Sequence, residues 1–238
     1  MRKKYLKGIV AGMMVGAVVL TNGQIVSAKT EKDWQWDFAH NYGVIYEGYN
    51  ARDYALKYCG EVGTCKTGGY NNAKYHNFVG HGGDCTNFVS QCIKRGGMVE
   101  VDDGRGYNNS DDDDKPSPGL DYYWCAGKQG RKWKATDTWT NCDEFEEYMR
   151  KSRSVTSYRR TSEEFVRKNA AVGDVVLFVD GNDAVHAMIV TMVTKKEIYL
   201  AGHSNNRDKH PLAEACDSYK NKCDYRFTLT LLKFTSVK

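Results

Sequence analysis

A cysteine and a histidine stand where they could act together as nucleophile and base. Cys85 follows Asp84 at the start of a segment ending near Gly97 whose apolar residues recur at helical spacing. The positive end of a helix lowers the pKa of a thiol there, and the thiolate is the reactive form of cysteine. His186 begins a strand-like apolar segment and could move the proton. The alternative is that Cys85 is an ordinary buried residue of the core.

The segment that follows His186 offers two groups that could orient such a base. The strand-like segments 186–193 and 197–203 predict a hairpin. If its loop has an even number of residues, the residue numbers of two cross-strand partners add up to an odd number. His186 then faces His203 in one register and Asn205 in the other. Because strand side chains repeat every two residues, both registers place His203 and Asn205 on the same face as His186. The alternative is that these polar residues only form a turn.

The elements that must position these residues can be predicted from periodicity and capping signals. Asp84 is a suitable N-cap for the helix that carries Cys85, and Gly96 and Gly97 would end that helix. We expect four helices and then four strands, and this segregation favours an α+β fold with N-terminal helices packed on a C-terminal antiparallel sheet. The helices are expected at 50–59, 84–97, 140–149 and 162–168, and the strands at 174–179, 186–193, 197–203 and 225–234.

The first 28 residues are typical of a secretory signal peptide. A basic start precedes an apolar run of 13 residues from Gly8 to Leu20, and small residues lead to a cleavage position after Ala28. The run is shorter than the roughly 20 residues of a membrane-spanning helix. We therefore expect a secreted or cell-wall-associated protein, with no stable membrane insertion after cleavage. Residues 29–238 are expected to form a single domain, in which 98–138 are a polar surface insertion.

Charge and cysteine content narrow the function classes. The chain carries 34 basic and 30 acidic residues, and four of the basic ones lie in the expected signal, so 34 − 4 = 30 leaves a neutral mature chain. That balance gives no support to nucleic-acid binding. Eight cysteines in an exported chain permit disulfides. Close spacing suggests three pairs, which are Cys59–Cys65, Cys216–Cys223 and Cys125–Cys142. The absence of any Cys-x-x-Cys pair makes a structural zinc site an unlikely feature of this sequence.

The segment Gly82-Gly-Asp-Cys-Thr-Asn-Phe-Val-Ser-Gln-Cys92 resembles the putative amidase domain family of secreted bacterial proteins, which is similar to CHAP-type and other papain-like peptidoglycan hydrolases. Further segments that resemble the family follow in its order, from Tyr49-Asn-Ala-Arg-Asp-Tyr-Ala55 through Asp137-Thr-Trp-Thr-Asn141 and Gly173-Asp-Val-Val176 to His186-Ala-Met-Ile-Val-Thr191 and Tyr199-Leu-Ala-Gly-His-Ser-Asn205. The resemblance implies a papain-like fold with Cys85 as nucleophile and His186 as base. His203 stands where papain-like relatives tend to carry the polar orienting group, and Asn205 is the alternative.

The resemblance further implies an amide hydrolase that works through a thioester, with peptide bonds of cell-wall peptidoglycan as substrate. Such chemistry requires no metal and no organic cofactor. Two alternatives stay open at this point. One is a secreted binding or toxin-like domain on the same frame without turnover, and the other is an acyltransferase, because the same thioester can be met by an amine.

Overall fold

The computed structural model describes residues 20–21, 24–25, 45–59, 70–71, 73–78, 84–101, 124–129, 132–152, 154–203 and 207–236. Within these residues the fold consists of helices on both sides of one large sheet, together with two small hairpins. The helices are α2 (Gly48–Tyr58), α3 (Cys85–Gly96), α4 (Asp137–Thr140), α5 (Cys142–Lys151), α6 (Glu163–Asn169) and α7 (Leu212–Lys220).

The large sheet has six antiparallel strands in the order β5-β10-β6-β7-β8-β9. Its strands are β5 (Val155–Thr161), β6 (Val175–Asp180), β7 (Asp183–Val193), β8 (Ile198–Gly202), β9 (Arg207–Pro211) and β10 (Phe227–Phe234). The small hairpins are β1 (Leu20–Thr21) with β2 (Gln24–Ile25) and β3 (Ala126–Gln129) with β4 (Lys132–Ala135). The predicted α+β class, with helices leading and an antiparallel sheet following, is confirmed.

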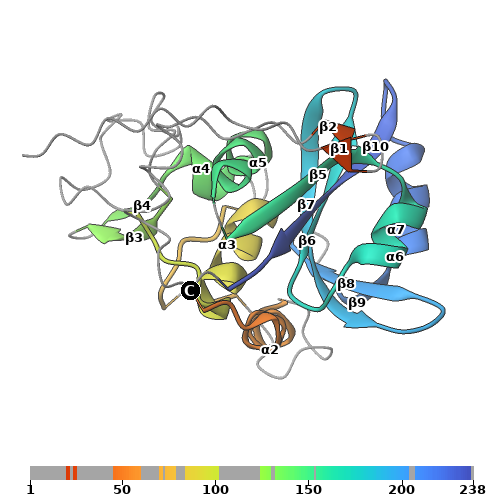
Figure 1. The fold of residues 1–238 in the computed structure, drawn as a ribbon. Helices are drawn as coiled ribbons and strands as arrows, with labels where there is room; N and C mark the ends of the chain where they lie inside the picture. Colours follow the sequence, from red (N-terminus) through yellow and green to blue (C-terminus); the bar gives the residue numbers. More distant parts are fainter. Residues whose placement is uncertain are drawn as a thin grey trace, which may run out of the picture.

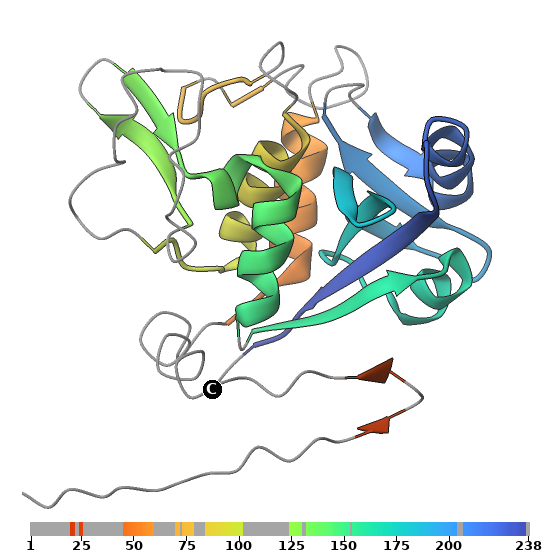
Figure 2. The same cartoon turned by 90° about the horizontal axis from the view of Figure 1, so that it is seen from above.

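The domain has three layers. Helices α2, α3, α4 and α5 lie on one side of the sheet, and α6 and α7 lie on the other, as Figures 1 and 2 show from two directions. Alternation along β7 feeds both cores, because Ala187 and Ile189 pack with the first helix layer whereas Met188 and Val190 pack with the second. Each face of the sheet therefore has its own apolar core, and β7 lies between them.

Local sequence explains the helix that carries Cys85. The stripe of Phe88, Val89, Cys92 and Ile93 is fully buried, which fixes α3 against the sheet. Gly97 ends the helix in the left-handed region at φ 119°, and its N–H reaches back to a carbonyl of the last turn. The expected helix and its end are thus confirmed.

A second glycine is required where the strand β6 begins. Gly173 has φ 91°, and a Cβ built on it would lie 2.3 Å from the Cα of Gly48 at the start of α2. Its carbonyl accepts a hydrogen bond of 2.7 Å from the hydroxyl of Tyr46. The Gly-Asp-Val-Val segment therefore allows the start of α2 to contact the chain just before β6, backbone to backbone.

Several elements were not expected from the sequence, namely β5, β9 and α7, the short helix α4 and the two small hairpins. The segment 98–138, expected as a polar surface insertion, also differs from that description at both ends. Met98, Val101 and Trp124 are buried, and Val101 forms a bridge with Trp124. Residues 102–123 lie outside the described part of the chain. The apolar ends fasten this segment into the first helix layer.

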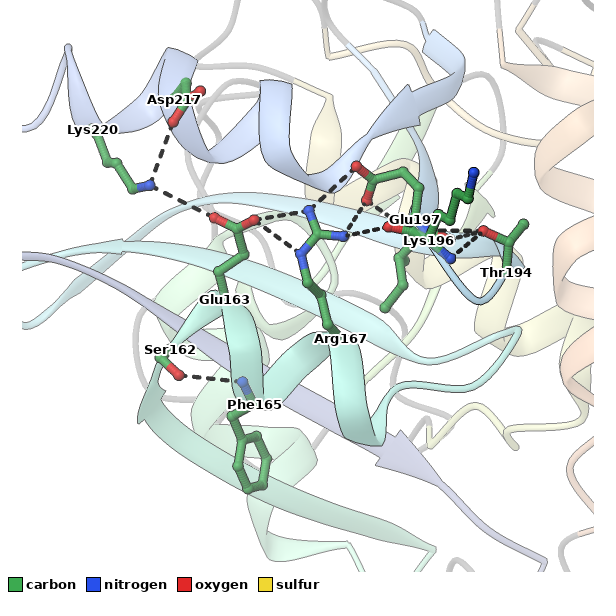
Figure 3. A network of polar contacts seen from close by, with 10 residues as sticks. Ser162, Glu163, Phe165, Arg167, Thr194, Lys196, Glu197, Asp217 and Lys220 are labelled. Atoms are coloured by element: carbon green, nitrogen blue, oxygen red, sulfur yellow. Dashed lines mark hydrogen bonds and ion pairs between the residues drawn. The ribbon is translucent and has the colours of Figure 1, made fainter.

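Charged side chains tie the second helix layer to the sheet (Figure 3). Arg167 of α6 contacts Glu163 at 2.8 Å and Glu197, just before β8, at 2.7 Å. Lys220 at the end of α7 lies 3.6 Å from the same Glu163. These partly exposed pairs contribute little each, and they link α6 to α7 and to the start of β8.

Candidate functional site

The site lies where β7 continues past the end of its neighbour β8. Pairing of these strands ends at Ile189↔Ala201. The N–H and C=O of Val190 form hydrogen bonds with residues 174 and 173, on the β6 side. Successive residues of a strand point their backbone N–H groups to alternate sides, so the N–H of Ala187 points toward the β8 side. There the N–H faces the sulfur of Cys85 and helps to lower the pKa of that thiol. The first residue of α3 thus occupies the place that a longer β8 would fill.

His186 reaches the same sulfur from the neighbouring position on β7. Its imidazole lies near enough to Cys85 to help lower the pKa of that thiol. The ring stacks on Tyr219 of α7, with centroids 5.1 Å apart and 21° between the planes, and contacts Phe178 at 5.9 Å. The Tyr219 and Phe178 rings also contact each other, with centroids 4.7 Å apart, so the imidazole packs against an aromatic pair. The helix α7 that carries Tyr219 gave no functional signal in the sequence, although its apolar residues at 212, 215, 216 and 219 follow helical spacing.

The environment favours the thiolate form of Cys85. A hydrogen bond from the Cys142 thiol is the largest influence that holds the pKa of Cys85 well below its ordinary value. The hydrogen bond and positive charge of His186 and the N–H of Ala187 act in the same direction, and together they outweigh burial, which raises it. The pKa of Cys142 is raised well above its ordinary value, because its proton is held by Cys85 and its surroundings are buried. The thiolate of this pair is therefore favoured on Cys85.

Cys142 is a member of the site that the sequence did not reveal. It is the first residue of α5, as Cys85 is of α3, and the two sulfur atoms are 3.8 Å apart. The hydroxyl of Thr86 lies 2.9 Å from the Cys142 sulfur. These contacts join residues 56 or 57 positions apart, so no local pattern could have predicted them.

His203 does not lie beside His186, and the prediction that both share a face is wrong. The hairpin turn has the expected register, with Val193 opposite Ile198, but Thr191 is an extra residue that shifts the pairing to Val190↔Leu200. This bulge changes the sum of paired positions from odd to even, so His203 falls on the opposite face from His186. The ring stacks on Phe88 of α3 instead, at 3.9 Å. Asn205, the alternative orienting residue, lies outside the described residues.

His203 is bound instead to Asp84, the residue immediately before the nucleophile candidate. Its Nδ1 lies 2.6 Å from Asp84 Oδ2, and its Nε2 lies 2.8 Å from the carbonyl oxygen of Tyr58. The other oxygen of Asp84 accepts hydrogen bonds from the Phe78 N–H and the Asn87 amide. Asp84 therefore occupies the predicted N-cap position without capping α3 through its side chain. It anchors the start of the helix sideways, to β8 and α2.

Two of the three cysteine pairs suggested by spacing, Cys125–Cys142 and Cys216–Cys223, are not formed. Cys142 is a free thiol beside Cys85, so it is not joined to Cys125, and Cys216 and Cys223 are free thiols as well. Cys65, the expected partner of Cys59, lies outside the described residues, as does His81. Cys85 itself is a free thiol, so its sulfur is available for chemistry.

The arrangement presents a half-buried thiolate to solvent beside an imidazole, which is the requirement for attack on a carbonyl carbon followed by proton return. Within the described ranges, no group of three or more His, Cys, Asp or Glu side chains is placed to hold a metal ion. None of the helices described here is long and apolar enough to cross a bilayer.

Comparison with protein families gives one match. The model of a family described as "Putative amidase domain" matches residues 45–228. That range includes α2 through β9 and α7, and so all the side chains of the site. Searches against curated proteins and against solved structures give no match.

Proposed function

The chain belongs to the putative amidase domain family, whose model matches most of its length, and from this premise we propose that it is a cysteine-dependent amide hydrolase of the papain-like kind. Cys85 is the nucleophile and His186 is the base. The observation that carries the proposal is the thiol of Cys85 at the start of α3, in contact with Cys142 and near His186 and the N–H of Ala187, which together hold its pKa well below the ordinary value.

The reaction follows from the positions of these groups. The Cys85 thiolate attacks the amide carbonyl carbon, and the protonated imidazole of His186 gives its proton to the departing amine, which leaves a thioester. Water then attacks the thioester while His186 takes its proton, and the Cys85 thiolate departs. The N–H groups at the first turn of α3 face the developing oxyanion, which a helix N-terminus stabilises. Stacking on Tyr219 and contact with the tilted ring of Phe178 keep the imidazole in position through both steps.

We further propose that the substrate is a peptide amide bond of cell-wall peptidoglycan, and that the protein is secreted or cell-wall associated. Two features of the sequence support this: the signal-like segment at 1–28 and the resemblance to secreted wall hydrolases. The orienting role is reassigned. Stacking on Tyr219 takes the place that was expected for His203, while His203 supports the start of the nucleophile's helix through Asp84.

The test uses protein recovered from the medium of cells that express the full chain. Purified peptidoglycan is incubated with wild type, Cys85→Ala, His186→Ala and, as matched control, Cys223→Ser, and newly released amino groups are measured. We expect Cys85→Ala to lose at least about 10³-fold in rate and His186→Ala about 10²–10⁴-fold, while the control stays near wild type.

The outcomes separate the alternatives. Full activity in Cys85→Ala would end the proposed mechanism. Cleavage of simple peptide amides without release from the wall would keep the hydrolase and remove the wall substrate. Saturable binding without any turnover would favour the binding domain, and transfer to an added amine in preference to water would favour an acyltransferase.

A further inference from the structure

Two free thiols face each other at the site, and the proposed amide hydrolysis uses only one of them. Cys85 and Cys142 are the first residues of α3 and α5, and their sulfur atoms are 3.8 Å apart. A disulfide requires about 2.05 Å between sulfur atoms, so they need to approach by roughly 1.8 Å, a distance that small side-chain and helix adjustments can provide. We propose that Cys142 is a resolving thiol that takes Cys85 into a reversible disulfide when a hydroperoxide oxidises the site.

The surroundings hold Cys142 in the position that this role requires. The Asn141 side chain accepts hydrogen bonds from the N–H groups of Asp143 and Glu144, which fixes the first turn of α5. The Thr86 hydroxyl contacts the Cys142 sulfur at 2.9 Å and belongs to the residue next to Cys85. In the reduced protein, the Cys142 sulfur is therefore already in contact with α3, beside Cys85.

Other described cysteines are placed less well to reach Cys85. Cys92 is fully buried two turns along α3, and Cys216 packs in the core on the opposite face of the sheet. Cys223 follows α7, near Asp180 and Asp224. Cys142 is thus the thiol in sulfur-to-sulfur contact with Cys85 among the residues that the structure describes.

The chemistry balances in two steps. The Cys85 thiolate attacks one oxygen of hydrogen peroxide, the O–O bond breaks, and hydroxide leaves, so that the sulfur becomes a sulfenic acid and the peroxide is reduced. The sulfur of Cys142 then attacks the Cys85 sulfur, the S–O bond breaks, and the departing hydroxide takes the Cys142 proton to form water. The net change is two thiols and one peroxide to one disulfide and two waters.

The consequence for the site is a reversible loss of its nucleophile, and this part of the inference rests on the proposed function. A disulfide leaves no thiolate to attack a carbonyl, whereas a reductant restores both thiols. Without a resolving partner, a sulfenic acid at Cys85 proceeds to the sulfinic acid, which a thiol cannot reverse. Cys142 therefore inactivates the site reversibly and also protects Cys85 from irreversible oxidation.

The test follows the sulfur atoms directly and needs no substrate. The reduced full-chain product from culture medium is treated with hydrogen peroxide, alkylated with iodoacetamide and mapped by mass spectrometry, as wild type, Cys142→Ser and the control Cys223→Ser. For wild type and the control we expect a mass loss of about 2 Da and a cross-link between tryptic peptides 75–94 and 135–150, with fragment ions that place the link on Cys85. After dithiothreitol, Cys85 should again react with iodoacetamide. For Cys142→Ser we expect a gain of about 32 Da on Cys85 and at least roughly tenfold lower recovery.

Two results would overturn the inference. One is wild-type protein that gains the sulfinic mass at Cys85 as fast as Cys142→Ser does, without a cross-link. The other is a cross-link from Cys85 to a different cysteine. Because the map requires no turnover, a chain that forms the cross-link yet cleaves no amide would retain the thiol pair and lose only the proposed function.

Discussion

Replacement of His203 by phenylalanine separates its observed position from the orienting role that its place in the sequence suggested. Phenylalanine keeps an aromatic ring on Phe88 and Tyr70, whose centroids lie 3.9 and 4.3 Å from that of His203. It removes both ring nitrogens. The change therefore isolates the polar contacts to Asp84 and to the Tyr58 carbonyl.

The magnitude follows from burial and from the nature of those partners. Only 2% of the His203 side chain and 1% of the Asp84 side chain are exposed. The two ring nitrogens face a carboxylate and a carbonyl, which both accept hydrogen bonds, and the contact with Asp84 is a buried pair. Removing one member of such a pair leaves the other charge unpaired and costs about 3–5 kcal/mol. Domains of this size are stable by about 5–15 kcal/mol, so the loss is large.

Urea unfolding followed by tryptophan fluorescence measures the effect, with His210→Phe as the matched control. His210 lies on β9 with a ring nitrogen 3.9 Å from the exposed carboxylate of Glu214, so its replacement is expected to cost less than about 0.5 kcal/mol. Adding Asp84→Asn to His203→Phe removes the stranded charge, so the double variant should recover at least about 1 kcal/mol by coupling. A His203→Phe variant as stable as the control would refute the reasoning.

Three further predictions concern the site and its support. Iodoacetamide should alkylate Cys85 rapidly at pH values well below about 8.5, and His186→Asn should move the midpoint upward, because the hydrogen bond and charge that lower the pKa are lost. The same shift means that the stability contributed by the Cys85 thiolate is fully present above the unfolded-state pKa and is lost as pH falls through the lower folded-state pKa. Tyr219→Phe should keep the pH profile of alkylation and the rate of hydrolysis near wild type. Tyr219→Leu removes the ring that stacks on His186, so it should lower the rate of hydrolysis by roughly tenfold or more. Rate measurements on the two variants check this. Gly173→Ala should lower the free energy of unfolding by at least about 2 kcal/mol in urea titrations, because its φ is 91° and the new Cβ meets Gly48 at 2.3 Å.

The helix that carries Cys85 could be predicted because all of its signals are local. A polar residue precedes it, an apolar stripe runs along it, and Gly97 ends it. The same applies to the turn of the hairpin, where the pairing of Val193 with Ile198 has the expected register. Local sequence predicted the elements of the site well, because each of these features is decided within one or two turns of chain.

Relations between elements were predicted less well, since each depends on one local event or on packing across the domain. A single bulge at Thr191 reversed the face of His203, and alternation alone gives no sign of an extra residue. The approach of Cys142 to Cys85 depends on how α5 packs beside α3. The helix α7 is different, because the spacing of Leu212, Ala215 and Tyr219 after Pro211 is a helical signal that the sequence did contain.

The position of His203 bears on the thiolate even though it does not touch it. A carboxylate at the start of a helix opposes the partial positive charge there, and Asp84 stands immediately before Cys85. Contacts with the His203 ring at 2.6 Å and with the Phe78 N–H hold that carboxylate so that it does not cap the N–H groups of α3. The first turn of α3 therefore keeps its positive end toward the sulfur, together with the N–H of Ala187 beyond the last β7–β8 pair. Backbone donors thus converge on one point where β8 has ended, and such a point stabilises an anionic sulfur and, in turn, an oxyanion.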